Sequence, residues 1–507
     1  MGPGCGSRPA HVLRPRERQA VTCSPLYSDI VLYNTNSVAG DLKGTALMTA
    51  ISRLAAVVVF GLGGAASHAA DLLDVYERAL QNDPLIREAE ALRLATLERR
   101  PQALAELLPQ LDASGSINKR DTEGSTTFLQ ALDPGPPPTT VIVNTDQETD
   151  SEFWQYQLQL RQTVFRWDQW VALQRADAEV AQAQIDYQAA EQDLIVRVSR
   201  RYFDVLAASD TLDAAVATAE AVERQLEQAE KRFEVGLIAI TDVQEARAAN
   251  DEATAAVIAA KRSLSTAEEL LRELTGELYR DLAAPGEDMP LKTPEPQDEL
   301  EWVEAALEQN LALQSSRLAT DIAKENVRVA RSGHYPSLDL VLSRTGFDQN
   351  ADQTNNGLTG PADADQTQDT ISLQLNFPIY SGGAVSSRVR EQVYRHRAAR
   401  ERLERTARET ERATRDAYLG VLSEISRVKA LRQAVESGRT ALQATEAGFE
   451  VGTRTTVDVL NARRQLFQAE TNYARSRYDY MINLILLQQA AGMLTRNDLD
   501  EINAWLD

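Results

Sequence analysis

The sequence predicts a mixed α/β membrane protein in which long coiled-coil helices continue directly into transmembrane antiparallel strands. Three observations predict this fold. A secretory signal lies near the N-terminus, two units of the chain repeat one another, and each unit changes between a strand-type and a helix-type hydrophobic period.

Composition limits the functions that the chain can have. Its 507 residues include 53 Lys and Arg against 75 Asp and Glu, so the formal net charge is −22, and 43% of the residues are hydrophobic. That apolar fraction is enough to bury a core. The excess of negative charge argues against nucleic acid as a partner, because its phosphates would be repelled. Two cysteines are too few for a disulfide framework or a four-ligand zinc site.

A signal peptide is predicted at residues 48–69. Arg53 supplies its positive start, residues 54–64 form its apolar stretch, and residues 67–69 give a small-residue cleavage site. The apolar stretch is shorter than the roughly 20 residues that a transmembrane helix needs. The alternative interpretation of this segment is an ordinary buried helix.

Residues 1–47 show neither a helical nor a strand period. We expect them to be an over-extended gene start, with Met48 as the initiator and mature protein from about Ala70. Cys5 and Cys23 both precede the signal. We therefore expect the mature chain to have no cysteine through which a lipid could anchor it.

Two repeated units are predicted to make up nearly all of the remaining chain. The motif LPQLD at 108–112 recurs as YPSLD at 335–339, and FEVG at 233–236 recurs at 449–452. We expect a first repeat at 70–284, in the order helix, strand, loop, strand, long helix, helix. A Pro-rich linker at 285–297 joins it to a second repeat at 298–507.

Proline placement predicts where long helices are possible, since no proline lies between Pro138 and Pro285 or after Pro378. Residues 167–235 are rich in Ala, Glu, Gln and Arg, with apolar residues spaced by three and four. They predict a helix on the order of 100 Å long. After a turn at Gly236, a second helix returns over 237–274. The second unit predicts the same pair at 385–447 and 453–491.

Strands are predicted where apolar and polar residues alternate, at 111–118, 154–164, 338–343 and 370–377. Each unit thus holds two strands of about 8–11 residues, the length at which a tilted strand crosses a bilayer. Polar connections at 119–151 and 348–369 would be long loops. A half-buried sheet in a soluble protein would show the same alternation, but the signal peptide and flanking aromatic residues favour the membrane.

Aromatic residues lie at both ends of the second strand, where a transmembrane barrel carries interfacial girdles. Phe153, Trp154 and Tyr156 lie at one end, and Phe165, Trp167 and Trp170 lie at the other. Four strands cannot close a transmembrane barrel, so several copies of the chain must assemble. Two copies would give eight strands and a filled interior, whereas three would give twelve and a lumen lined by the polar strand faces.

Short motifs in both units resemble those of a known family. Residues 236–247 (GLIAITDVQEAR) and 448–460 (GFEVGTRTTVDVL) resemble the two repeat signatures of the TolC family of outer-membrane efflux channels. Residues 375–383 (LNFPIYSGG) resemble the strand-to-helix junction of that family. Two shorter motifs, VYERA at 75–79 and LLPQL at 107–111, resemble its first helix and first strand.

The resemblance implies a homotrimer with a twelve-stranded barrel in the outer membrane and a long α-helical barrel through the periplasm, with a C-terminal equatorial segment. It implies a passive exit duct for type I protein secretion, multidrug efflux or both. The implied partners are an inner-membrane transporter (ABC or proton-driven), a periplasmic adaptor protein and outer-membrane lipid. The duct is expected to need no catalytic residue, cofactor or metal.

Two other classes of protein are compatible with parts of the pattern. A periplasmic adaptor or structural protein of an export complex could also be built on helical hairpins, but it would need lipoyl-like and β-barrel modules that the sequence does not show. An enzyme is disfavoured, because only His334 and His396 follow the signal, no cysteine does, and no glycine-rich phosphate loop occurs.

The resemblance also implies a periplasmic gate. The arginine of the family signature matches Arg454, and its partners match Thr241 and Asp242 of the other unit. The family's tyrosine partner of that aspartate corresponds to Phe449. Because Phe449 has no hydroxyl, this hydrogen bond of the gate cannot form.

An entrance ring is the last feature that the resemblance implies. Its two aspartates correspond to Asp458 and Asn461, of which only the first is acidic. A trimer would therefore carry three such carboxylates rather than six. Because like charges in a narrow ring favour cations, we expect milder cation selectivity and weaker block by multivalent cations.

Overall fold

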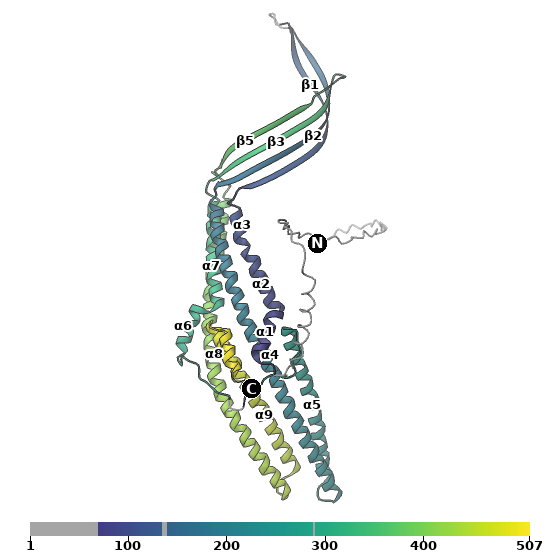
Figure 1. Cartoon of the computed structure of the whole chain (residues 1–507), viewed down its shortest axis with the longest axis vertical. Coiled ribbons are helices and arrows are strands. Elements are labelled where there is room, and N and C mark those ends of the chain that lie inside the picture. The colour runs from purple at the N-terminus through teal and green to yellow at the C-terminus, as the bar shows by residue number, and fades with distance from the viewer. Residues whose placement is uncertain (1–68, 134–138, 287–288, 507) are drawn as a thin grey trace, which may run out of the picture. The chain divides into compact units, whose positions relative to one another are not determined.

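The computed structural model describes residues 69–133, 139–286 and 289–506, which form one compact unit. The predicted N-terminal extension and the predicted signal peptide, apart from Ala69, lie outside the described residues. Within this unit, an antiparallel sheet lies at one end of a set of long helices. Two helical hairpins reach away from the sheet at the other end (Figure 1).

The chain runs twice from shorter helices through paired strands into a helical hairpin. Its first half holds α1 (Leu72–Asn82), α2 (Pro84–Leu97), α3 (Arg99–Ala105), β1 (Gln110–Asp133), β2 (Thr139–Phe165), α4 (Trp167–Glu234) and α5 (Ile240–Thr275). Its second half holds α6 (Glu299–Gln309), α7 (Leu311–Ser332), β3 (Ser337–Asn355), β4 (Leu358–Pro361), β5 (Ala364–Asn376), α8 (Ala384–Glu450), α9 (Thr456–Ala491) and α10 (Arg496–Asn503).

The prediction of four long helices in two hairpins is confirmed. We call α4 with α5 hairpin 1, and α8 with α9 hairpin 2. Each turn contains a glycine, Gly236 with φ +73° and Gly452 with φ +77°, values that residues with a side chain rarely adopt. A glycine in a proline-free window therefore ends the first helix of each hairpin, one residue before the predicted boundary in α4 and three residues after it in α8.

The strands pair in the order β1–β2–β3–β5, all antiparallel, with the short β4 beside the outer part of β3. The adjoining helices pack in the matching order, because α3 leads to β1, β2 continues into α4, α7 leads to β3, and β5 leads into α8. The strands thus form one sheet, and the helices that adjoin them form one row that packs in the same order. Among the described residues, β1 and β5 each have one edge without a strand partner.

The prediction that the strands span only about 8–11 residues is wrong. β1 and β2 stay paired from Gln110 and Arg161 out to Asp133 and Thr139, so most of the loop predicted at 119–151 is a long hairpin. The loop predicted at 348–369 is likewise largely strand, since β3 reaches Asn355. Over Lys119–Thr126 and the facing residues of β2 both faces of the hairpin are polar, and the apolar residues beyond them (Phe128 and Leu129 facing Val143 and Ile142) do not alternate with polar ones, so no alternation marks these strands in the sequence.

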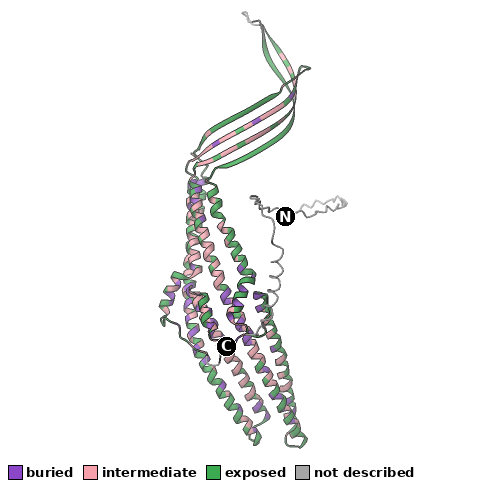
Figure 2. Ribbon diagram, in the orientation of Figure 1, coloured by how far each residue is buried: buried purple, intermediate pink, exposed green. Residues whose placement is uncertain are grey.

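The inner part of the sheet has one apolar and one polar face, as predicted. Apolar residues of neighbouring strands face each other, for example Leu111 with Leu160 and Leu340 with Leu373. Although apolar, this face is open to solvent: Ile117 is 88% exposed and Ile371 is 77% exposed. The two outer strands are almost entirely exposed, as Figure 2 shows.

A close packing contact crosses the middle of this apolar face. Gly346 of β3 lies directly opposite Tyr156 of β2, and the ring of Tyr156 covers it. A Cβ at position 346 would lie 2.0 Å from the ring of Tyr156, so only glycine leaves room for this side chain.

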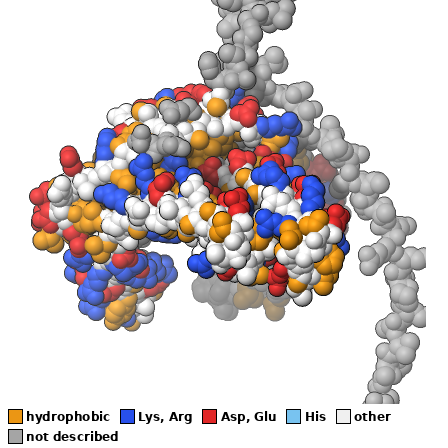
Figure 3. Space-filling view, turned by 90° about the horizontal axis from the view of Figure 1, so that it is seen from below, with side chains coloured by type: hydrophobic (Ala, Val, Ile, Leu, Met, Phe, Trp, Pro, Cys, Tyr) orange, Lys and Arg blue, Asp and Glu red, His pale blue; other side chains and the backbone are white. Residues whose placement is uncertain are grey.

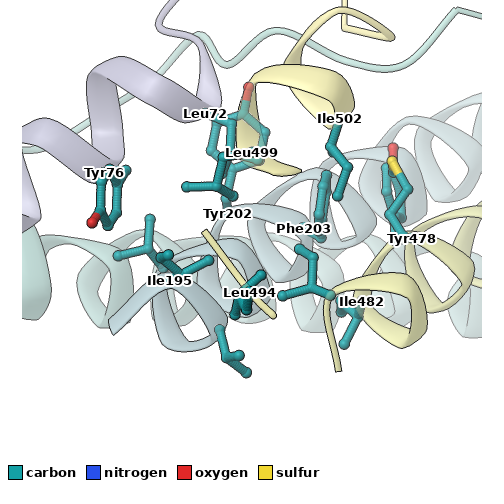
Figure 4. Close-up of a cluster of buried hydrophobic side chains, with 14 of the residues drawn as sticks. Leu72, Tyr76, Ile195, Tyr202, Phe203, Tyr478, Ile482, Leu494, Leu499 and Ile502 are labelled. Carbon is teal, nitrogen blue, oxygen red and sulfur yellow. The ribbon is translucent and has the colours of Figure 1, made fainter. Parts of the chain in front are cut away.

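The main core lies where the two halves of the chain meet beside α1 and α10 (Figure 4). Phe203 of α4 stacks on Tyr478 of α9 with ring centroids 5.8 Å apart, and Tyr202 meets Phe203 edge-on. The hydroxyl of Tyr202 donates to the carbonyl of Ala283 at 2.6 Å. This core fixes hairpin 1 against hairpin 2 midway along the helices and leaves their far ends free of it.

Candidate functional site at the hairpin ends

The predicted gate residues lie at the free ends of the two hairpins, far along the chain from each other but at the same end of the helical part (Figure 1). Thr241 and Asp242 lie in the first turn of α5. Phe449 lies in the last turn of α8, and Arg454 lies in the turn before α9. Figure 3, seen from below, shows acidic and basic side chains interspersed over this end.

Each hairpin is fastened near its end by an ion pair at the matching place. In hairpin 1, Arg247 of α5 donates to Glu230 of α4 at 3.0 Å. In hairpin 2, Arg463 of α9 donates to Glu446 of α8 at 2.5 Å. The two pairs occupy the same positions relative to the FEVG turns. The two hairpin ends therefore have equivalent local structures, so residues at equivalent positions of the two ends can be compared one by one.

Asp458 has a structural role that the sequence interpretation missed. Its carboxylate accepts hydrogen bonds from the backbone N–H of Thr455 at 2.9 Å and from the hydroxyl of Thr455 at 3.0 Å, while its own N–H donates back to that hydroxyl. This reciprocal capping box begins α9. These hydrogen bonds, and then the charge of Arg454, lower the pKa of Asp458. The pattern Thr455-x-x-Asp458 was the signal for it.

Asp242 occupies the matching position in hairpin 1 without such a partner. The residue three before it is Ala239, which has no hydroxyl to complete a capping box. Among the described residues, no hydrogen bond or ion pair engages the carboxylate of Asp242. Asp242 is therefore free to take a partner from elsewhere, whereas Asp458 is already engaged.

The predicted contacts of Arg454 are absent within the single chain. Its backbone N–H donates to the carbonyl of Gly448 at 3.2 Å, and its side chain is exposed. In the described part of the chain, no ion pair or hydrogen bond joins Arg454 to Thr241 or Asp242. The pairing stays a prediction. Asn461, the second predicted ring residue, is also exposed, one turn beyond Asp458 on α9.

Phe449 is engaged in a contact that the sequence did not predict. It is only 9% exposed and packs with Leu442 and Val459 of its own hairpin. The guanidinium of Arg232, in the last turn of α4, lies over its ring with 4.5 Å from the guanidinium carbon to the ring centroid. The contact joins the ends of the two hairpins. Arg232 was missed because its partner is distant in the sequence.

The structure separates the predicted aromatic girdle onto two faces. Trp154 stacks on Tyr156 with centroids 5.4 Å apart, and its indole N–H donates to Asp348 at 3.2 Å. Phe153 points to the opposite, polar face and meets Phe347, because consecutive residues of a strand alternate sides. Phe153 therefore does not share the apolar face of Trp154.

At the other end, Phe165 is the last residue of β2, and Trp167 and Trp170 lie in the first turn of α4; they are 40%, 38% and 52% exposed. At about 3.3 Å per residue the strand from Phe165 to Trp154 is about 36 Å long, and a strand of that length tilted by about 40°, as in a transmembrane barrel, would rise about 28 Å. That distance is close to the thickness of the hydrocarbon core of a bilayer.

In the part of the chain that the structure describes, no helix combines the length and the apolar character that membrane crossing requires. Residues 69–133, 139–286 and 289–506 also contain no group of three or more His, Cys, Asp or Glu side chains arranged to hold a metal ion.

The fold and the paired signatures define a family. The family model described as "Outer membrane efflux protein" matches residues 75–277 and 302–493, and the chain therefore belongs to the outer membrane efflux protein family. It is an outer-membrane exit duct for secretion and efflux rather than an enzyme. The family supports the predicted channel over the alternative of a periplasmic adaptor.

Relatives of known name agree with this assignment. The chain is 36% identical to outer membrane protein TolC of Escherichia coli (strain K12), over 86% of this chain and 85% of that protein. It is 34% identical to TolC of Vibrio cholerae, over 86% and 94%. It is 28% identical to the alkaline protease secretion protein AprF of Pseudomonas aeruginosa, over 85% and 86%.

Solved structures share the fold. The CmeC outer-membrane channel of Campylobacter jejuni superposes with a TM-score of 0.66 at 18% identity, covering 86% of this chain and 90% of that chain. The outer-membrane protein VceC of Vibrio cholerae superposes with a TM-score of 0.64 at 18% identity, covering 83% and 96%.

Proposed function

We propose that three copies of this chain form a homotrimeric channel whose strands close into a twelve-stranded barrel in the outer membrane. The observation that carries the proposal is the sheet itself. It has an exposed apolar face, and β1 and β5 keep unpaired edges among the described residues. Because an open edge is intolerable in lipid, β5 of one copy pairs with β1 of the next until the ring closes.

The helices support the same assembly. α3 and α8 adjoin the two outer strands, and they are the outer members of the row of helices. Exposed apolar side chains lie along α8 and along α3 and the helix before it, α2, including Tyr394 of α8, Leu104 of α3 and Leu92 of α2. When the strands close, these helices meet as well, and a helical barrel continues the tube through the periplasm.

We also propose that the chain arose by duplication of one unit. The family model matches two separate segments, and the ion pairs Glu230–Arg247 and Glu446–Arg463 occupy matching positions. The boundaries proposed from the sequence are 70–284 and 298–507, joined by the Pro-rich linker and ending in an equatorial segment.

The polar face of the sheet lines the duct, and the apolar face contacts outer-membrane lipid. Ser114, Gln157 and Ser372 face the water-filled lumen in this arrangement, whereas Leu111, Leu158 and Leu373 face the hydrocarbon. The girdle on the lipid face consists of Trp154 and Tyr156 at one end and Phe165, Trp167 and Trp170 at the other.

The duct serves type I protein secretion and multidrug efflux as the outer component of a larger machine. Relatives are named for both roles, among them the alkaline protease secretion protein AprF and the outer membrane efflux protein BepC of Brucella suis. The chain holds no energy source in this proposal. An inner-membrane transporter, either an ABC or a proton-driven pump, and a periplasmic adaptor protein open it.

The hairpin ends form the periplasmic gate. Arg454 pairs with Thr241 and Asp242 in the closed state, and the unengaged carboxylate of Asp242 supports this pairing. Asp458 and Asn461 form the entrance ring. Because the capping box already engages Asp458, the ring holds cations weakly.

The test is to extract the protein from outer membranes in detergent, measure its mass and record single-channel conductance in a planar bilayer. A mass of three chains and a small, discrete conductance are expected from a closed trimer. A water-soluble monomer without conductance would contradict the proposed function.

A further inference from the structure

The contact between Arg232 and Phe449 joins the two hairpins beyond the main core. Arg232 lies in the last turn of α4, and Phe449 lies in the last turn of α8. The aromatic ring presents its negative π face to the guanidinium at 4.5 Å. Among the described residues, no carboxylate pairs with Arg232, so the ring is the partner of its charge.

The comparison of the two hairpins shows that this burial is specific to one end. Phe233 occupies in hairpin 1 the position that Phe449 occupies in hairpin 2, yet Phe233 is 41% exposed and Phe449 is 9% exposed. Leu442 and Val459 pack against Phe449 within its own hairpin. Arg232 adds a contact from the other hairpin, whereas no described Lys or Arg side chain lies over the ring of the matched residue Phe233.

Two ion pairs also bridge the hairpins: Arg475–Asp204 lies beside the main core, and Arg464–Glu252, nearer the hairpin ends, is highly exposed. Arg464 of α9 donates to Glu252 of α5 at 3.0 Å, but their side chains are 62% and 68% exposed. Exposed pairs contribute little and are screened by salt. A cation held over a buried ring is less hydrated and less screened, so the Arg232 contact retains its strength at physiological ionic strength.

We propose that Arg232 is a positioning residue of the gate, which holds hairpin 1 against hairpin 2 in the closed state by a cation–π contact with Phe449. The inference rests on the proposed function, because it assumes that the hairpin ends separate when the duct opens. Phenylalanine suits this contact, since it needs an aromatic face and no hydroxyl. Opening must break the contact before the ends can part.

Conductance of the full-length protein in a planar bilayer tests the role in gating. Loss of the contact in Arg232→Gln or Phe449→Leu is expected to raise the open fraction about two- to fivefold. Phe449→Leu keeps an apolar side chain but removes the π face, and Arg232→Lys keeps the cation and should stay near the unchanged protein. The double variant should exceed neither single variant, because both remove one interaction.

The matched control is Arg224→Gln, on the same helix two turns earlier. Arg224 pairs with Glu220 at 3.9 Å, and both side chains are more than 60% exposed. This variant should leave the open fraction unchanged. An unchanged open fraction in Arg232→Gln, or effects of Arg232→Gln and Phe449→Leu that add, would overturn the proposal.

A second measurement separates this inference from the channel itself. Spin labels at Val235→Cys and Val451→Cys, in a chain carrying Cys5→Ser and Cys23→Ser, report the distance between the hairpin ends. Labelled chains are diluted into excess unlabelled chains, so that each assembly holds at most one labelled pair. A longer or broader distance in Arg232→Gln supports the contact even if no conductance appears, and an unchanged distribution overturns it.

Discussion

At the scale of single residues, Asp210 shows how burial sets the charge of a side chain in the main core. It lies on α4 and accepts a hydrogen bond from the hydroxyl of Tyr478 on α9 at 2.6 Å. Burial raises the pKa of Asp210, although this hydrogen bond and the charge of Arg477 oppose the rise. The ionised carboxylate is therefore less favourable in the folded protein than in the unfolded chain.

Asp210→Asn is expected to melt at the same or a higher temperature than the unchanged protein at pH 7. A raised pKa contributes stability that is present below the unfolded pKa of about 3.9 and is lost as the pH rises through the folded pKa. Asparagine can still accept the Tyr478 hydrogen bond and avoids that loss. Melting curves at pH 4 and pH 7 check this, and a variant that is less stable only at pH 7 would contradict it.

The residues of the proposed gate show what a sequence can and cannot predict at this scale. The first-turn positions of Asp242 and Asp458 follow from the glycine turns, and the capping box of Asp458 was visible as Thr455-x-x-Asp458. Arg232 was not predictable, because its partner Phe449 is brought to it only by the packing of two hairpins. A capping box can be predicted because its residues are neighbours in the sequence, whereas contacts between hairpins depend on the whole fold.

At the scale of elements, the first turns of α5 and α9 differ by one hydroxyl. Thr455 engages Asp458 in a capping box, whereas Ala239 leaves Asp242 free. Ala239→Thr is expected to complete the missing capping box and to slow amide hydrogen exchange in the first turn of α5. If Asp242 serves the gate, drawing its carboxylate into the cap should also raise the conductance.

The matched control for this prediction is Ala239→Val, which adds the same branched bulk without a hydroxyl. This variant cannot form the capping box, so it should change neither the amide hydrogen exchange in the first turn of α5 nor the conductance. Equal conductance in Ala239→Thr and Ala239→Val would contradict a role of Asp242 in the gate. The capping box itself is tested separately, by the hydrogen-exchange rates.

The helices were more predictable than the strands for a physical reason. α4 ends one residue before the predicted boundary, because a proline-free helical sequence meets a glycine turn. The sequence predicts loops for the outer parts of β1 and β2, because pairs such as Thr122 with Thr149 and Glu123 with Glu148 present no apolar side to a core. Their backbone pairing continues from the inner strands rather than from any pattern of their own.

At the scale of the whole molecule, the single chain forms an open sheet and an open row of helices rather than a closed barrel. Its core joins the two halves midway along the helices, but its sheet exposes apolar residues on one face and leaves β1 and β5 unpaired on their outer sides, within the residues described. Exposed apolar surface of this extent marks a region meant for lipid or another chain. The need for further copies stays a prediction, which follows from the number of strands because four strands cannot close a transmembrane barrel.

The measurement that tests the assembly most directly is disulfide trapping between Ser114→Cys on β1 and Ser372→Cys on β5. Within one chain two strands separate these positions, roughly 14 Å at about 4.8 Å per strand, which is too far for a disulfide. In the proposed ring, β1 of one copy lies beside β5 of the next. Thr370→Cys and Gln374→Cys, on the same face as Ser372, cover a shift in register.

The background chain carries Cys5→Ser and Cys23→Ser, and each single-cysteine variant serves as a control. Under oxidising conditions in intact outer membranes, we predict bands of two and three linked chains on a denaturing gel, with none larger and with reversal by reductant. The absence of linked chains for every β5 position, or a ladder that continues past three, would contradict a closed ring of three copies.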